Sequence, residues 1–256
     1  MQEKRSKILG TFLFLVLISG LIYLIFFSTR KTNKGEIRMI QVTGNSLLSE
    51  GDYLNFTKLN DQTHYNEITL PVIKSRFEKH PYVEKADVEY LSGNIAKVVL
   101  TEKKIEAVLL YNGEPDFITE NFEILPVLAN TKFMDLPVIS NPKITNKIKP
   151  FSIYKDDDIV QAFEIIEAAK LTNESIAKKL SEINLRNGGE IILSFSGVKP
   201  PVLFGRSEAA KKMVYLDIMW NGIVEGNSLV ENSDYIDLRF ANEIYIGAAE
   251  KTGLSE

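Results

Sequence analysis

The strongest constraint on the fold of this chain is a run of 20 residues near its N-terminus that carries no charge. The run covers residues 8–27 and reads ILGTFLFLVLISGLIYLIFF. As an α-helix it would span about 30 Å, at about 1.5 Å per residue, which matches the hydrocarbon core of a bilayer. It is longer than the apolar part of a secretory signal peptide, and the sequence STRK that follows contains no cleavage site of the Ala-x-Ala type. The sequence therefore predicts a retained transmembrane helix.

The predicted helix separates a short cytoplasmic tail, residues 1–7, from a body that begins after a linker, residues 28–36. Basic residues flank both ends of the helix, so the positive-inside rule does not decide its orientation. Residues 1–34 contain six bases and one acid, which leaves 24 bases and 33 acids in the rest of the chain. Because a nucleic-acid-binding surface needs a basic face, the acidic body argues against a nucleic-acid partner.

Several classes of chemistry are excluded or disfavoured by the residues present. The chain has no cysteine, which excludes a disulfide framework, a thiolate zinc site and a cysteine nucleophile. Its two histidines, His64 and His80, leave little room for a histidine metal site or a Ser-His-Asp triad. The acidic triplet at residues 156–158 precedes a helical pattern, and we interpret it as a helix cap and not as a metal site. With no G-x-S-x-G, H-E-x-x-H or P-loop motif, we expect no enzyme, no metal, no cofactor and no small-molecule substrate.

The first predicted domain covers residues 37–104 and has the element order β-α-α-β-β. The predicted elements are a strand over 36–42, helices over 48–54 and 70–80, and strands over 86–90 and 95–100. In the second helix Leu70, Ile73 and Phe77 fall on one face. Residues 86–90 alternate between apolar and polar, as a half-buried strand does.

This domain resembles a POTRA domain, a small module of that element order found in extracytoplasmic proteins. Residues 42–45 read VTGN, which is similar to the V-x-G-N signature at the end of the first POTRA strand. Residues 81–88 read PYVEKADV, which is similar to the P-x-V-x-x-A-x-V signature. Proline 81 in this segment ends the preceding helix, because the residue before a proline disfavours helical backbone.

The second predicted domain covers residues 105–250 and is a mixed α/β domain built on an antiparallel-rich sheet, followed by a tail over 251–256. Asn112-Gly113 between two apolar runs is a strong hairpin signal. Apolar residues at helical spacing predict a helix over 159–169, and a second helix is expected from Ser207 to about Trp220. Strands are expected at 183–186, 191–196, 202–205, 235–240 and 244–246. The expected fold class of the whole chain is α+β.

The complete series of features resembles the FtsQ/DivIB family of bacterial cell-division proteins. The supporting segments read LPVI at 136–139, FGR at 204–206 and YIDLRF at 235–240, and the last is similar to the I-D-L-R-Y/F strand of that family. The resemblance implies a single-pass protein of the bacterial inner (cytoplasmic) membrane whose body is periplasmic and lies at the division septum. It also implies a non-catalytic divisome scaffold that links early and late cell-division proteins and controls septal peptidoglycan synthesis.

The resemblance further implies that the C-terminal strands bind an FtsB-like protein, with an FtsL-like protein beside it, while the helix contacts membrane lipid. The implicated partner-binding residues are Tyr235, Arg239, Phe240, Asn242, Glu243, Ile244, Tyr245 and Ile246. By strand parity Phe240 shares a face with Ile236 and Leu238, so it could be a core residue or a contact. If a partner strand adds to this edge, Tyr245→Pro is expected to abolish binding, since proline removes a backbone donor.

Two other functions remain open from the sequence. A POTRA-bearing assembly factor for outer-membrane proteins usually has several such modules or a β-barrel, and about 150 residues after one module are few for a barrel with its loops. A membrane-anchored hydrolase is disfavoured because the catalytic motifs are absent. Filamentous cells after depletion would favour the division scaffold over both.

Overall fold

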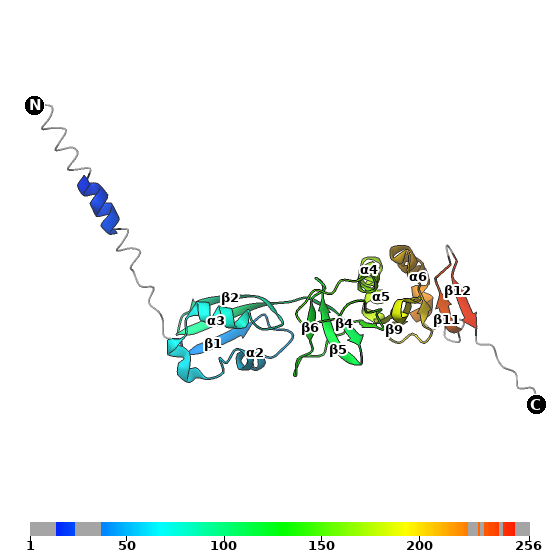
Figure 1. Cartoon of the computed structure of the whole chain (residues 1–256), viewed down its shortest axis with the longest axis horizontal. Helices are drawn as coiled ribbons and strands as arrows, with labels where there is room; N and C mark the ends of the chain where they lie inside the picture. The colour runs from blue at the N-terminus through cyan, green and yellow to red at the C-terminus, as the bar shows by residue number, and fades with distance from the viewer. Residues whose placement is uncertain (1–13, 24–36, 225–229, 231–232, 241–242, 249–256) are drawn as a thin grey trace, which may run out of the picture.

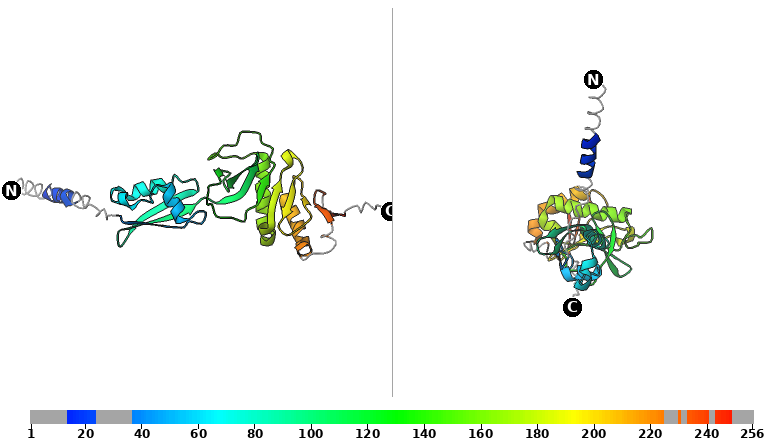
Figure 2. Two further views of the ribbon diagram at one scale, coloured as in Figure 1. Left: turned by 90° about the horizontal axis from the view of Figure 1, so that it is seen from below. Right: turned by 90° about the vertical axis from the view of Figure 1, so that its left-hand side faces the viewer.

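A computed structural model of the 256-residue chain describes residues 14–23, 37–224, 230, 233–240 and 243–248. Two folded bodies follow one another along the long axis of the molecule (Figures 1 and 2). The expected cytoplasmic tail, linker and C-terminal tail lie outside the described residues, as does most of the N-terminal segment.

The prediction of a transmembrane helix is contradicted by the structure. The described part of the apolar run is a helix over residues 14–23, which at about 1.5 Å per residue covers about 15 Å, half of a bilayer core. Among the residues that the structure describes, no helix is long and apolar enough to cross a membrane. The predicted localisation as a single-pass inner-membrane protein is therefore not supported, and the other residues of the predicted span lie outside the description.

The first body contains a three-stranded sheet and the helices that pack on it. Its elements are β1 (Met39–Thr43), α2 (Glu50–Phe56), the 3-10 helix η1 (Gln62–Glu67), α3 (Leu70–Phe77), β2 (Val83–Leu91) and β3 (Ile95–Glu102). The strand order is β1-β3-β2, with β1 parallel and β2 antiparallel to β3. The strands and both α-helices were predictable from the sequence, whereas η1 was not.

Local sequence explains where these elements begin and end. Ser49 and Asp52 form a reciprocal capping box at the start of α2. On α3, Ile73 and Phe77 are fully buried, in agreement with the predicted apolar stripe. Gly44 follows β1 with a φ of +80°, and a Cβ there would collide with the carbonyl oxygen of Leu100. The glycine of the VTGN segment is therefore required by a left-handed turn against β3.

His80 lies in the core of the first body, surrounded by aromatic rings. Its ring centroid is 4.5 Å from that of Tyr53, 4.4 Å from Phe56 and 5.6 Å from Tyr82. The backbone N–H of Tyr82 donates to His80 Nδ1 at 3.1 Å. Burial lowers the pKa of His80 to about 4, and the nearby carboxylate of Glu102 only partly opposes this shift. The folded state therefore holds His80 as a neutral acceptor.

This histidine should make the first body sensitive to acid. Because the folded-state pKa lies below the ordinary value of 6.5, the unfolded chain binds the proton more readily, and stability falls as the pH drops from 6.5 towards 4. We expect a loss of about 2–3 kcal/mol in unfolding free energy across this window. Denaturant titrations of wild type and His80→Gln at both pH values measure it. An equal pH dependence in the two proteins would contradict the assignment.

The second body contains a nine-stranded sheet with α-helices on one side. Its strands are β4 (Ile105–Tyr111), β5 (Glu114–Thr119), β6 (Ile124–Pro126), β7 (Val138–Ser140), β8 (Leu180–Asn184), β9 (Ile192–Phe195), β10 (Val202–Leu203), β11 (Ser233–Asp237) and β12 (Tyr245–Ala248). The helices are α4 (Asp157–Thr172), α5 (Glu174–Lys179), the 3-10 helix η2 (Arg186–Gly188) and α6 (Ala209–Val224). The strand order is β12-β11-β10-β9-β8-β7-β4-β5-β6.

This sheet is mixed, so the expected α+β class of the chain is corrected to mixed α/β, although five of its eight strand pairs are antiparallel, as expected. The β4–β7, β7–β8 and β10–β11 pairs are parallel. The physical reason is that α4 and α5 connect β7 to β8, and α6 connects β10 to β11, so each helical connection returns the chain in the same direction. The predicted hairpin is confirmed: Asn112 and Gly113 have φ values of +52° and +84° between β4 and β5, as a type I′ turn requires.

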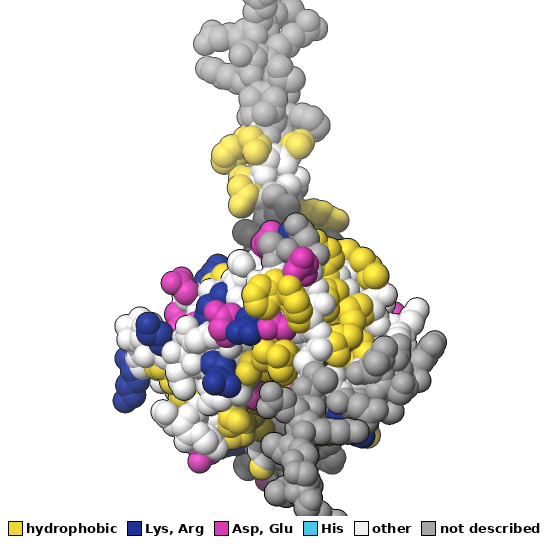
Figure 3. Space-filling model, turned by 90° about the vertical axis from the view of Figure 1, so that its right-hand side faces the viewer, with side chains coloured by type: hydrophobic (Ala, Val, Ile, Leu, Met, Phe, Trp, Pro, Cys, Tyr) yellow, Lys and Arg dark blue, Asp and Glu magenta, His cyan; other side chains and the backbone are white. Residues whose placement is uncertain are grey.

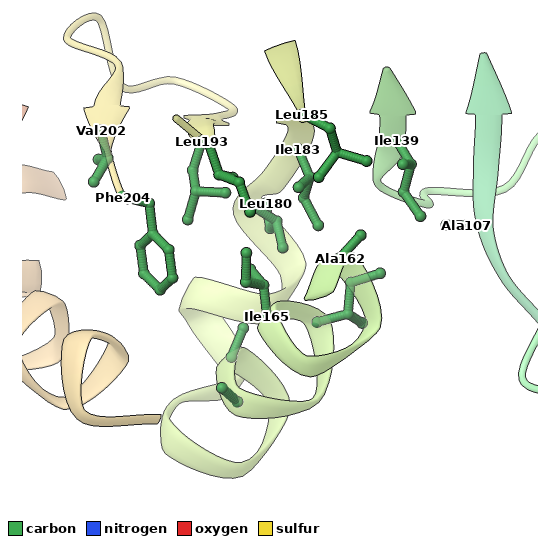
Figure 4. Packing of buried hydrophobic residues seen from close by; sticks show 14 of the residues in the cluster. Ala107, Ile139, Ala162, Ile165, Leu180, Ile183, Leu185, Leu193, Val202 and Phe204 are labelled. Carbon is green, nitrogen blue, oxygen red and sulfur yellow. The ribbon is translucent and has the colours of Figure 1, made fainter. Parts of the chain in front are cut away.

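The core of the second body lies between the sheet and the helices. In Figure 4, Ala162 and Ile165 of α4 lie below a row of side chains that includes Ile183 and Leu193 from strands and Phe204 just after β10, and all of these are buried. From α6, the core residues are Met213, Leu216, Trp220 and Ile223. The single tryptophan is fixed by a bond from its indole nitrogen to Ser175 Oγ at 3.0 Å.

The two bodies share a core at their junction. Phe117 of β5 and Leu125 of β6 belong to the hydrophobic cluster of the first body. The loop after β6 adds polar contacts: the N–H of Leu128 donates to the hydroxyl of Tyr82 at 2.8 Å, and the N–H of Lys132 donates to the carbonyl of Leu47 at 2.9 Å. Side chains of the second body therefore complete the core of the first, although the sequence placed the boundary at residues 104 and 105.

Candidate partner-binding site

One edge of the nine-stranded sheet is closed by the chain itself. The N–H of Ile124 in β6 donates to the carbonyl of Ser152 at 3.0 Å, and the N–H of Phe151 donates back to the carbonyl of Ile124 at 2.7 Å. The N–H of Tyr154 also donates to the carbonyl of Phe122 at 2.8 Å. The segment from 151 to 154 therefore occupies the outer side of β6 and leaves no free edge there.

The other edge is β12, and the direction of its backbone groups follows from its neighbours. Ile236 donates its N–H to Pro201 and Leu238 donates to Leu203, so these residues of the β11 segment face β10. Tyr235 and Asp237 then face β12, since backbone groups alternate along a strand, and their partners are Gly247 and Tyr245. Ile246 must therefore direct its N–H and C=O outward. No strand among the described residues pairs with this side of β12.

This geometry corrects the expected effect of a proline at position 245. The N–H of Tyr245 faces β11, because Tyr245 pairs with Asp237. A proline there would disrupt the β11–β12 pair itself instead of testing the free edge. Ile246 is the position at which proline removes an outward donor.

Aromatic side chains surround the open edge. Phe240 is 52% exposed and Tyr245 is 48% exposed, and their rings meet edge to face with centroids 5.0 Å apart. Tyr235 is 39% exposed, and its ring occupies the space in which a Cβ of Gly247 would stand. Figure 3 looks onto this end of the molecule, where hydrophobic side chains gather beside acidic and basic ones. Exposed aromatic groups of this kind are common anchors in protein interfaces.

The structure places most of the predicted partner-binding residues at this edge. Glu243 is exposed and accepts a hydrogen bond from the hydroxyl of Tyr245, which raises the pKa of that tyrosine. Ile246 is also exposed, whereas Ile244 is half-buried and packs against the core. Asn242 lies outside the described residues.

The question of Phe240 is resolved in favour of an exposed residue. Ile236 and Leu238 are buried, as the strand parity predicted, but β11 ends at Asp237. The alternation therefore does not extend to Phe240, and its side chain is not part of the core.

Arg239 is exposed but is held by an ion pair that sequence reasoning missed. Its guanidinium donates to both carboxylate oxygens of Asp237, at distances from 2.6 to 3.1 Å. This pairing lowers the pKa of Asp237, which is buried. Lys212 of α6 contributes a second positive charge near Asp237. Burial lowers the pKa of Lys212, whose ammonium donates to the carbonyl of Phe204 at 2.7 Å.

The acidic triplet at the start of α4 has a structural role in the described structure. Asp156 is the N-cap of α4 and accepts from the N–H of Ile159 at 3.1 Å, which confirms the interpretation as a cap. Asp158 is buried and bonds to the guanidinium of Arg206 at 2.8 Å. Arg206 belongs to the FGR segment, so the sequence contained both residues but gave no signal that they pair. Within the described ranges, no three His, Cys, Asp or Glu side chains are grouped as metal ligands would be.

The site therefore offers backbone pairing and aromatic contacts, as an interaction surface does. Comparison of the sequence with known protein families and with curated proteins found no match.

Proposed function

We propose that this protein is a non-catalytic scaffold in bacterial cell division that binds an FtsB-like partner, with an FtsL-like protein beside it. The partner adds an extended segment to β12, in parallel or antiparallel register, and continues the sheet. The observation that carries this proposal is the contrast between the two sheet edges: residues 151–154 cover β6, whereas Ile246 presents its backbone groups outward.

Two further observations support the proposal. The YIDLRF segment, which carries the most specific resemblance to the FtsQ/DivIB family, supplies the last three residues of β11 and the three residues that follow it. The exposed rings of Tyr235, Phe240 and Tyr245 lie beside the edge, so side chains there can discriminate between partners.

Site-specific cross-linking in the cell tests this proposal. A photoreactive phenylalanine analogue at Tyr245 should cross-link to a small division protein, whereas the same analogue at the exposed Phe133 should not. Depletion of the protein should give filamentous, undivided cells. Normal division after depletion, or an identical set of cross-links from both positions, would contradict the proposal.

A further inference from the structure

A hollow of about 1130 Å³ lies on the helical side of the second body, apart from the open strand edge. It is bordered by α4, the start of α6 and the turn after β5, and none of its lining residues belongs to β11 or β12. The rings of Phe122 and Phe163 stack at its base, with centroids 4.4 Å apart. Leu171, at the end of α4, is 79% exposed beside it. We call this hollow the α4–α6 groove; α4 and α6 are neighbours in Figure 1.

The apolar surface of the groove continues along α6. Ala210, Val214 and Ile218 are spaced by four residues, so they share one face of the helix. All three are exposed, and Ile218 is 75% exposed. This face points away from the core, which α6 contacts through Leu216 and Trp220. The row begins at Ala210, which lines the groove, so exposed apolar residues extend from the groove along α6.

Some of the charged side chains that line the groove are in ion pairs, and others are not. Lysines on its rim are held by glutamates: Lys104 pairs with Glu120 at 2.9 Å, Lys170 pairs with Glu106, and Lys211 pairs with Glu208 at 3.5 Å. The remaining lining lysine, Lys155, lies at one end with its ammonium 4.7 Å from the ring centroid of Phe122.

Two glutamates in the middle of the groove have no such partner. Glu164 and Glu167 are exposed on α4, and within the described ranges neither forms an ion pair. Among the described lining residues, two carboxylates are therefore outside ion pairs, against one lysine, Lys155.

The apolar and acidic residues of α4 that line the groove recur at helical spacing. Val160, Glu164, Glu167 and Leu171 lie on one face of α4, with an apolar residue at each end and the two acids between them. The row is about 17 Å long, at about 1.5 Å per residue, which corresponds to about three turns of a second helix. The backbone N–H and C=O groups of α4 and α6 are hydrogen-bonded within each helix, so they are not available to a bound segment. The backbone groups of that segment must therefore be hydrogen-bonded within the segment itself.

We propose that the α4–α6 groove binds an amphipathic, basic helix of a partner protein. Apolar side chains of that helix cover Phe122, Leu171 and the α6 row, and its lysines or arginines pair with Glu164 and Glu167. A helix fits because it brings its own backbone hydrogen bonds, in contrast to the extended segment at β12. The two surfaces are independent, so either can bind without the other.

The test uses the full chain and a synthetic peptide of about four turns, with leucines at helical spacing and lysines on the flanks. In fluorescence polarisation the peptide should bind the wild type, more weakly at high salt. Glu164→Lys combined with Glu167→Lys should weaken binding at least about tenfold, because two ion pairs become repulsive. The same peptide with glutamates in place of its lysines should bind this double variant better than it binds the wild type.

Matched controls separate the groove from general charge effects. Glu67→Lys combined with Glu114→Lys makes the same change in net charge at residues outside the groove lining and should leave binding unchanged. Leu171→Ser, at an exposed position, should weaken binding without lowering the melting temperature. The proposal would be overturned if both double variants weakened binding equally. It would also be overturned if a peptide of the same composition in scrambled order bound equally well, or if the designed peptide did not bind the wild type. Ile246→Pro should leave peptide binding intact.

Discussion

Replacing Ile246 by proline should reduce the affinity for the strand partner at least about 30-fold, which corresponds to about 2 kcal/mol. The substitution removes the outward N–H and places a ring where the added strand must approach. Proline is tolerated on edge strands, so the pairing of β11 with β12 should persist. The measurement is a binding titration with the partner captured by cross-linking, accompanied by a thermal melt of each variant.

Two companion variants isolate the backbone contribution. Ile246→Ala keeps the N–H and removes most of the side chain, so it should bind better than Ile246→Pro. Tyr245→Pro should lose binding and also lower the melting temperature, because it damages the contact with Asp237 in β11. If Ile246→Pro and Ile246→Ala bind alike, the backbone of β12 does not carry the recognition.

Replacing Arg206 by methionine should destabilise the second body by about 3 kcal/mol, because it leaves a buried carboxylate unpaired. The guanidinium joins three parts of the fold. It donates to Asp158 at 2.8 Å, to the carbonyl of Gly189 at 2.6 Å and to the carbonyl of Leu185 at 2.9 Å. The first partner begins α4, while the other two flank η2. Chemical denaturation of the purified protein measures the change.

A double-mutant cycle identifies the cause of that loss. Asp158→Asn keeps an oxygen for the backbone N–H of Lys143, which donates to Asp158 at 2.6 Å, but removes the charge. In the Arg206→Met background this second change should cost much less than it does alone, with a coupling energy of at least about 1.5 kcal/mol. Additive effects would mean that the two charges do not depend on each other.

Elements with a strong local signal could be predicted from the sequence. The apolar spacing of Ile73 and Phe77 identified α3, the acids before Ile159 identified the start of α4, and Asn112-Gly113 identified a hairpin. Each of these depends on neighbours within a few residues. The short parallel strand β7 has no such signal, because its three residues are held by β4 and β8, which are distant in the sequence.

The position of the C-terminal strands was predictable from the sequence, but the contacts of their residues were not. The segment from 235 to 246 was correctly placed at the C-terminal strands, and Phe240 was left open because strand parity alone cannot show where a strand ends. The buried carboxylate of Asp237 pairs with Arg239 and has Lys212, 25 positions earlier in the chain, as a second positive charge nearby, and the outward direction of Ile246 depends on how β11 pairs with β10. The prediction of a transmembrane helix from the apolar run is contradicted, because the helix described over residues 14–23 is too short to cross a membrane.

The contrast between the closed edge at β6 and the open edge at β12 limits how the nine-stranded sheet can assemble. An endless stack of copies needs two free edges on every molecule, one to donate and one to receive. Since residues 151–154 occupy the β6 side, another strand can add to this sheet at only one of its two described edges, β12. Through the described edges of this sheet, two copies could pair only by joining β12 to β12, which would use the same backbone groups of Ile246 that a partner strand requires. Self-association through this edge would therefore compete with partner binding, and lowering the concentration of this chain at a constant partner concentration would favour the heteromeric complex.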